Sequence, residues 1–106
     1  MNDMERWDEV FKMIGDTVVD RAQHRVGKVR DVAQIADTME PGWLIVKTSR
    51  FGRERLVPIA SAVVHGDVVE IPFSKEAVLE APVPVVPGTV AESEREKLAR
   101  YYASAA

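Results

Sequence analysis

The densest group of chemically capable side chains in this sequence is Arg50-Phe51-Gly52-Arg53-Glu54-Arg55. Guanidinium groups bind carboxylates and phosphates through paired hydrogen bonds, and an exposed aromatic ring can stack on a base or pack on another protein. Arg50, Phe51, Arg53 and Arg55 are therefore a candidate partner contact on a predicted hairpin. The plain alternative is a solvated turn whose arginines pair with nearby acids, and a nucleic-acid contact is the third.

The other residues that could do chemistry are too scattered to predict a catalytic or metal site. His24 and His65 fall in predicted turns and are not spaced as a ligand pair, and there is no cysteine. Asp16, Asp20 and Asp31 lie near strand ends, where turn formation and solubility account for them. No serine has a neighbouring base at a recognisable spacing, and no glycine-rich phosphate loop is present. We expect no enzymatic activity, no cofactor and no metal.

The composition is that of one folded domain. The chain has 106 residues, of which 46% are hydrophobic and 29% charged, with a formal net charge of −3. It can bury one modest core, and its negative charge does not favour nucleic acid or an anionic membrane. The N-terminus lacks the basic and apolar regions of a signal peptide, and no apolar run approaches the roughly 18 residues of a membrane span. We therefore expect a cytoplasmic protein.

Short β-branched runs between glycine turns predict the elements that position these residues. The apolar residues of 26–36 recur every three positions, which suits a helix, but Gly27 and the β-branched content favour a strand with a bulge. Pro58 indicates an edge strand or a strand end. A turn is expected over 37–42, with Pro41-Gly42 as its punctuation. Strands are predicted over residues 17–20, 26–36, 43–48, 54–59, 62–65 and 67–71, the last two forming a hairpin through Gly66-Asp67.

These strands are expected to share one apolar core. Residues 43–46 are apolar on both faces, so their strand should be covered by the sheet interior on one side and by a helix or a second subunit on the other. Several short strands at close spacing favour a small antiparallel barrel. The predicted core consists of Val18, Val29, Leu44, Val46, Leu56, Val57, Val68 and Ile71.

Helices are predicted at both ends of the chain. An apolar stripe marks a helix over residues 3–13 that Gly15 ends. Ser74 is expected to cap a short helix over 75–79, and 81–88 have the composition of an extended linker. Thr89 and Glu92 resemble a capping box for the last helix. The N-terminal stripe consists of Met4, Trp7, Val10, Phe11 and Ile14, and the C-terminal stripe of Leu98, Tyr101 and Tyr102.

Six segments occur in an order and spacing that resemble one known domain. They are Ile14–Asp20, Val26–Val32, Glu40–Val46, Glu54–Pro58, Gly66–Val69, and Ser74–Glu76 with Ala81-Pro82. The domain is the PRC-barrel, which is shared by the photosynthetic reaction-centre H subunit, the ribosome-maturation factor RimM and many small stand-alone bacterial proteins. The family carries no catalytic motif. The resemblance implies a β-barrel that makes protein–protein contacts, often with self-association.

The expected architecture is therefore mainly β: a small antiparallel PRC-type β-barrel with N-terminal and C-terminal α-helices. We divide the chain into an N-terminal amphipathic helix over residues 1–13, a PRC-barrel domain over 14–82, and a proline-containing linker with the C-terminal helix over 83–106.

The predicted function is a non-catalytic module for protein–protein interaction or homodimerisation. The chain holds more apolar positions than one small barrel encloses, and a twofold interface is the commonest way to bury such a surface. The terminal helices could instead fold back over the barrel within one chain. A ribosome- or RNA-associated maturation factor resembling RimM is the alternative function, although a shared fold is a weak argument for a shared role. The candidate dimer contacts are Trp7, Phe11, Trp43, Tyr101 and Tyr102.

Overall fold

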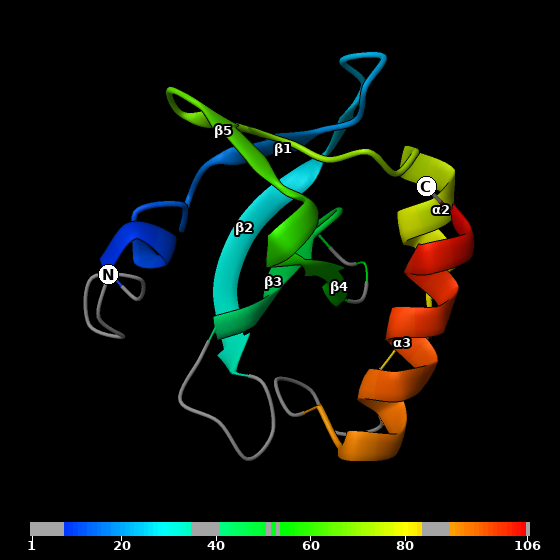
Figure 1. The fold of residues 1–106 in the computed structure, drawn as a ribbon. Coiled ribbons are helices and arrows are strands. Elements are labelled where there is room, and N and C mark those ends of the chain that lie inside the picture. The colour runs from blue at the N-terminus through cyan, green and yellow to red at the C-terminus, as the bar shows by residue number, and fades with distance from the viewer. Residues whose placement is uncertain (1–7, 35–40, 51, 53, 84–89, 106) are drawn as a thin grey trace.

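The structure is a computed structural model that describes residues 8–34, 41–50, 52, 54–83 and 90–105 (Figure 1). Residues 8–11 are helical and precede the first strand; the predicted start of this helix lies outside the described residues. The 3₁₀ helix η1 spans Ile59–Ser61, and the α-helices are α2 (Lys75–Leu79) and α3 (Glu92–Ala105). The strands are β1 (Thr17–Val19), β2 (Arg25–Gln34), β3 (Pro41–Lys47), β4 (Glu54–Pro58), β5 (Val63–His65) and β6 (Val68–Glu70).

The strands form one mixed sheet in the order β4-β3-β2-β1-β6-β5. Four of the pairings are antiparallel, but β1 and β6 run parallel, so the prediction of a purely antiparallel barrel is wrong. The reason lies in the link between β4 and β5. This link is a crossover through η1 from one end of the sheet to the other, and not a hairpin. The β5–β6 hairpin then returns the chain alongside β1 in the same direction.

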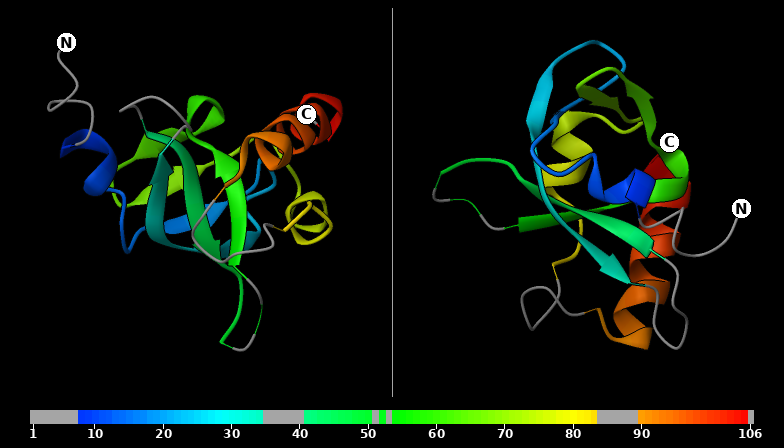
Figure 2. Two further views of the ribbon diagram at one scale, coloured as in Figure 1. Left: turned by 90° about the horizontal axis from the view of Figure 1, so that it is seen from below. Right: turned by 90° about the vertical axis from the view of Figure 1, so that its left-hand side faces the viewer.

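This crossover also makes the sheet curl. In a flat sheet of six strands the outer strands would lie about 24 Å apart, at roughly 4.8 Å per step. Residues 59–62 are all that joins β4 to β5, and the step from Pro58 to Val63 spans at most about 18 Å when fully extended. The two ends of the sheet must therefore approach each other (Figure 2). Within the described residues no ladder pairs β4 with β5, so the predicted closed ring of strands is not formed.

The long second strand contains the predicted bulge. Its register against β3 shifts between Val29 and Asp31 and again between Ala33 and Gln34, which gives β2 its bend. Gly27 permits the close approach of the two strands, because a Cβ there would lie 2.3 Å from the carbonyl oxygen of Lys47. The strand interpretation of residues 26–34 is thus confirmed over its helical alternative.

The core agrees with the predicted set except at one position. Val18, Leu44 and Val57 are among the fully buried side chains. Val68 is only half-buried, whereas its neighbour Val69 is completely buried. In the parallel pair Val69 lies beside Val18, so it is Val69 that faces the interior. The predicted core included both Val68 and Ile71, but alternate residues of a strand face the same side, so Val69 and Ile71 are the two that are buried and Val68 is the error.

The third strand is buried on both faces, as predicted. Trp43, Leu44, Ile45 and Val46 are all buried. Helix α3 provides part of the cover: a shallow hollow lies between Trp43 and Pro58 on one side and Arg95, Glu96 and Ala99 on the other. A helix of the same chain therefore lies against the strand that the sequence assigned either to a helix or to a second subunit. Figures 1 and 2 show α3 on the opposite side of the sheet from residues 8–11.

Local signals at the turns are mostly confirmed. The hydroxyl of Ser74 accepts a hydrogen bond from the N–H of Ala77, as a cap of α2 should. At α3 the carboxylate of Glu94 accepts from the N–H of Ala91, which is the glutamate half of a capping box, and Thr89 of the predicted box lies outside the described residues. Pro41 and Gly42 belong to β3 and not to a turn, which corrects that prediction.

Candidate interaction surfaces

The two C-terminal tyrosines hold α3 to the rest of the chain. The hydroxyl of Tyr102 donates to the carbonyl of Leu56 at 2.5 Å, and that of Tyr101 donates to the carbonyl of Ala77 at 2.5 Å. The Tyr102 ring also packs on Phe73, with ring centroids 4.5 Å apart. Burial raises the pKa of both tyrosines, most strongly that of Tyr102. Their hydroxyls are therefore structural groups in the neutral form.

Three of the predicted dimer contacts thus lie against the same chain. Trp43 is 6% exposed and Tyr102 is 3% exposed, and Tyr101 is half-buried. Side chains buried to this extent leave little area for a second copy. Phe11 remains well exposed, and Trp7 lies outside the described residues. The C-terminal helix therefore folds back over the same chain, which is the alternative that the sequence left open to a dimer contact.

The predicted arginine cluster does not form one surface in the described part of the chain. Arg50 is exposed near the end of the β3–β4 hairpin, which projects from the body in both views of Figure 2. Arg55 is half-buried instead, and its Nη1 donates to the carbonyl of Ala81 at 3.3 Å. Phe51 and Arg53 lie outside the described residues. One of the three arginines therefore ties β4 to the segment after α2.

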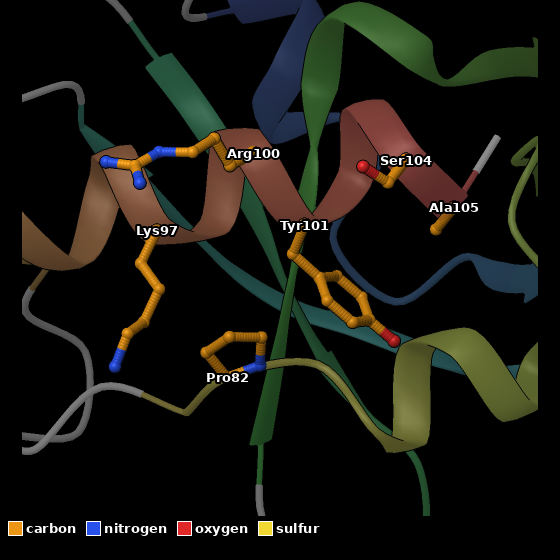
Figure 3. Close-up of a pocket in the computed structure, with 6 residues that line it drawn as sticks. All are labelled: Pro82, Lys97, Arg100, Tyr101, Ser104 and Ala105. Carbon is orange, nitrogen blue, oxygen red and sulfur yellow. The ribbon is translucent and has the colours of Figure 1, made fainter.

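A second group of cations borders an open hollow beside α3 (Figure 3). Tyr101 and Pro82 form its apolar floor, and Lys97 and Arg100 project from the helix on one side. Arg100 lies 3.9 Å from the Glu96 carboxylate, and both side chains are largely exposed, so this pair contributes little to stability. The Tyr101 hydroxyl donates to the carbonyl of Ala77 and is therefore engaged within the fold.

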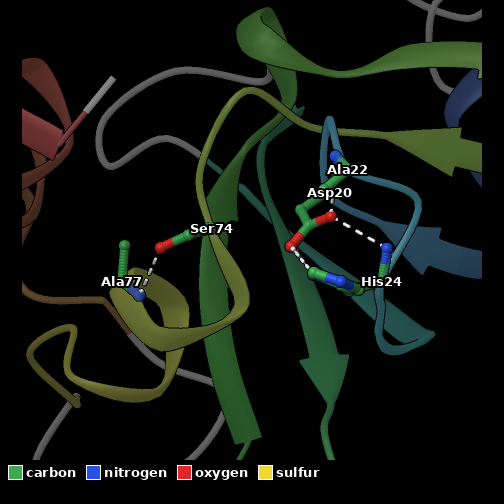
Figure 4. Close-up of polar contacts among 5 residues, drawn as sticks. All are labelled: Asp20, Ala22, His24, Ser74 and Ala77. Carbon is green, nitrogen blue, oxygen red and sulfur yellow. Dashed lines mark hydrogen bonds and ion pairs between the residues drawn. The ribbon is translucent and has the colours of Figure 1, made fainter.

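The one buried charged side chain among the described residues is Asp20 (Figure 4). Its Oδ1 accepts from the N–H groups of Ala22 and His24 at 3.0 and 2.9 Å, and His24 Nδ1 lies 3.3 Å from Oδ2. Burial acts to raise the pKa of Asp20, but the backbone and side chain of His24 and the backbone N–H of Lys75 outweigh it and lower that pKa. Asp20 therefore fixes the β1–β2 turn and links it to the start of α2. This fits its predicted role in turn formation.

The described side chains offer no group of three histidines or acids that could hold a metal ion. No helix in that part of the chain is long and apolar enough to cross a membrane.

Four exposed apolar side chains lie on β5 and on the segment before β1. Val63 and Val64 of β5 are 52% and 44% exposed, and Phe11 and Ile14 near the N-terminus are 48% and 41% exposed. The two segments border one hollow, which is lined by Glu9, Lys12, Met13 and Asp16 together with Val64 and Gly66. We call Phe11, Ile14, Val63 and Val64 the β5 surface.

Sequence reasoning missed the two valines of this surface. The available signal was their position: two adjacent valines on a three-residue strand beside a turn cannot both face the core.

The two outer strands of the sheet differ in their environment. Pro58 has no N–H to donate to β3, so Pro58 and Trp43 form a non-hydrogen-bonded pair. The two kinds of pair alternate along an antiparallel ladder, so Leu56 and Ile45 also form a non-hydrogen-bonded pair. The carbonyl of Leu56 therefore points away from β3, and the Tyr102 hydroxyl of α3 occupies it. At the other end of the sheet all three residues of β5 are exposed.

The family model of the PRC-barrel domain matches residues 8–78, which is more than half of the chain. No curated protein matches the chain.

Proposed function

We propose a role that starts from family membership: the chain belongs to the PRC-barrel family, and it acts as a non-catalytic, cytoplasmic module for protein–protein contact, including contact with itself. The contact is made through the β5 surface. The chemistry of such a module is burial of apolar side chains and pairing of strand backbone, and it needs no reactive group.

The observation that carries this proposal is that one edge of the sheet is covered and the other is exposed. An exposed strand edge presents N–H and C=O groups that another strand can pair with, and folded proteins usually cover or charge it. In this chain the β4 edge lies against α3, whereas β5 carries Val63 and Val64 with half of each side chain exposed. Phe11 and Ile14, on the segment that borders the same hollow as Val64, are also exposed. Exposed apolar side chains beside an open edge are typical of a docking site.

The alternative of an RNA-associated factor has less support. It rests on the resemblance to RimM, and a shared fold is a weak argument for a shared role. Of the arginines that could contact RNA, Arg55 is bonded to the carbonyl of Ala81 inside the fold. The net charge of −3 also opposes binding to a polyanion.

A capture experiment tests the proposal. Immobilised wild-type protein, Val63→Lys and Leu79→Lys are incubated with soluble host extract, and bound proteins are identified by mass spectrometry. Leu79, on α2, is an exposed apolar residue outside the β5 surface, so it is the matched control. We expect partners, including further copies of the chain, that bind wild type and Leu79→Lys but not Val63→Lys. Equal capture by Val63→Lys would place the contact elsewhere.

A second measurement separates the RNA alternative. Fluorescent single-stranded RNA is titrated with the protein at low salt, and no binding is expected. Binding that weakens steeply as salt rises would instead favour the RNA-associated role.

A further inference from the structure

The outer face of β5 presents the backbone of one residue. The β5–β6 hairpin closes through the two-residue loop Gly66-Asp67. The φ angle is positive at Gly66, at 64°, and is not positive at Asp67, as in a type II′ turn. In such a hairpin the residues that flank the loop, His65 and Val68, form a hydrogen-bonded pair. The next pair, Val64 with Val69, is then not hydrogen-bonded, because the two kinds alternate. The N–H and C=O of Val64 therefore point away from β6.

We infer that two copies of this chain pair their β5 strands antiparallel about a twofold axis at Val64. The two Val64 residues would exchange both N–H···O=C hydrogen bonds, and the sheets of the two copies would become continuous. Val63 of each copy would face His65 of the other. This inference rests on the proposed role as an interaction module, and it names the partner and the geometry of that contact.

The sequence of the edge is complementary to itself in this register. Pairing about Val64 sets Val63 opposite His65, so no two charges of the same sign meet within β5. Edge strands are commonly protected by lysine, proline or an inward charge, and β5 has none of these. A twofold contact uses the same patch on both copies, which this register satisfies.

A second copy fits the surface better than a linear peptide does. The strand has only three residues, so a single extended segment would gain few backbone hydrogen bonds from it. A stable interface buries roughly 800 Å² on each partner. A folded copy brings more surface to the contact than a peptide does, because the residues beside Val64, such as Lys12 and Met13, would also lie close to the new strand pair.

The other end of the sheet limits the assembly to two copies. The outward carbonyl of Leu56 is bonded to Tyr102, and α3 lies beside β4. Each copy therefore has one open edge, and strand pairing closes after one step instead of continuing into a filament.

The first test is the mass in solution, measured by light scattering and analytical ultracentrifugation at micromolar concentration. We expect about twice the 11.8 kDa chain mass for wild type and for Leu79→Lys. Val64→Pro removes the outward N–H without taking a hydrogen bond from β6, and proline is tolerated at such a position. Val64→Pro and Val64→Lys should both fall to the monomer mass while keeping a cooperative thermal transition. A dimer that survives in both folded variants would overturn the proposed pairing.

The second test reads the register by disulfide trapping, since the chain has no cysteine of its own. Hydrogen-bonded partners on antiparallel strands have Cα atoms about 5.5 Å apart, within the range of about 4.4–6.8 Å that a disulfide spans. Val64→Cys should therefore form a covalent dimer under mild oxidation. Val63→Cys should not, but the double variant Val63→Cys, His65→Cys should. Linkage of Val64→Cys no faster than of Leu79→Cys would refute the geometry.

The outcomes separate this inference from the proposed function. A monomer at all concentrations that still captures other proteins through Val63 would overturn the pairing and leave the interaction role intact. A monomer that captures nothing would overturn both. A doubled mass with rapid linkage at position 64 supports the pairing.

Discussion

Removing the hydroxyl of Tyr102 should loosen the whole C-terminal helix. The substitution Tyr102→Phe keeps the ring that packs on Phe73 and deletes only the donor to the Leu56 carbonyl. A hydrogen bond contributes about 1 kcal/mol net, and a buried acceptor left without a partner adds to the loss, so we expect about 1–3 kcal/mol. At roughly 4–8 °C per kcal/mol for a domain of this size, the melting temperature should fall by at least about 4 °C.

Tyr101→Phe is the matched control for this measurement. It also deletes one hydroxyl bonded to a backbone carbonyl, but Tyr101 is half-buried, so water can replace the lost donor at the carbonyl of Ala77. Differential scanning calorimetry of both variants should show a clearly smaller loss for Tyr101→Phe. If the two losses are equal, or Tyr102→Phe costs less, the argument that this buried bond anchors α3 to β4 is wrong.

The same tyrosine predicts a dependence on alkaline pH. Its pKa is raised in the folded state above the usual value of 10.0. The folded protein therefore holds a proton that the unfolded chain releases, and the associated stability is complete below about pH 10 and falls as the pH rises further. The absorbance of tyrosinate should appear together with unfolding in wild type, and the Tyr102→Phe variant should lose less stability above pH 10.

Four further outcomes follow from the packing. Leu44→Ala should cost about 2–5 kcal/mol in chemical denaturation, because the side chain is fully buried. Val69→Ala should destabilise much more than Val68→Ala, and the reverse order would restore the original strand parity. Gly27→Ala should cost about 1–3 kcal/mol or more by thermal melting, because a Cβ there collides with backbone of β3. Asp20→Asn should lower the melting temperature at neutral pH; since the pKa of Asp20 is lowered on folding, the difference from wild type should shrink as the pH falls below about 4.

Local features of the fold could be predicted because each depends on a few neighbouring residues. The Gly66-Asp67 hairpin and the Ser74 cap follow from turn and cap chemistry alone. The bulge in β2 was inferred from apolar spacing that fits neither a plain strand nor the surrounding turns. The direction of β6 could not be inferred in the same way, because it depends on whether residues 59–62 form a hairpin or a crossover. The error at Val68 has another source, because Val69 and not Val68 faces the same side as Ile71.

The interaction surface was harder to predict for a related reason. An apolar stripe indicates that a side chain will be covered, but it does not identify what covers it. Trp43 and Tyr102 carried the strongest such signal, and α3 of the same chain covers them. Arg55 lies in a segment whose composition is typical of a docking loop, but its side chain is bonded to the carbonyl of Ala81 within the fold. The exposed apolar side chains that remain include Val63 and Val64 of β5, which the sequence assigned neither to the core nor to a contact.

From the proposed pairing through β5, we expect stability and assembly to be coupled through α3. The helix takes up the outward carbonyl of Leu56, and in doing so it removes one of the two edges at which sheets could join. A change that detaches the helix, such as truncation of residues 90–106, would expose the β4 edge together with Trp43. Two open edges per copy allow open-ended pairing, whereas one open edge allows only a closed pair. The detached state is therefore expected to form large aggregates, and light scattering during thermal unfolding should rise where α3 is lost. If scattering stayed flat while α3 detached, β4 would not be a second pairing edge.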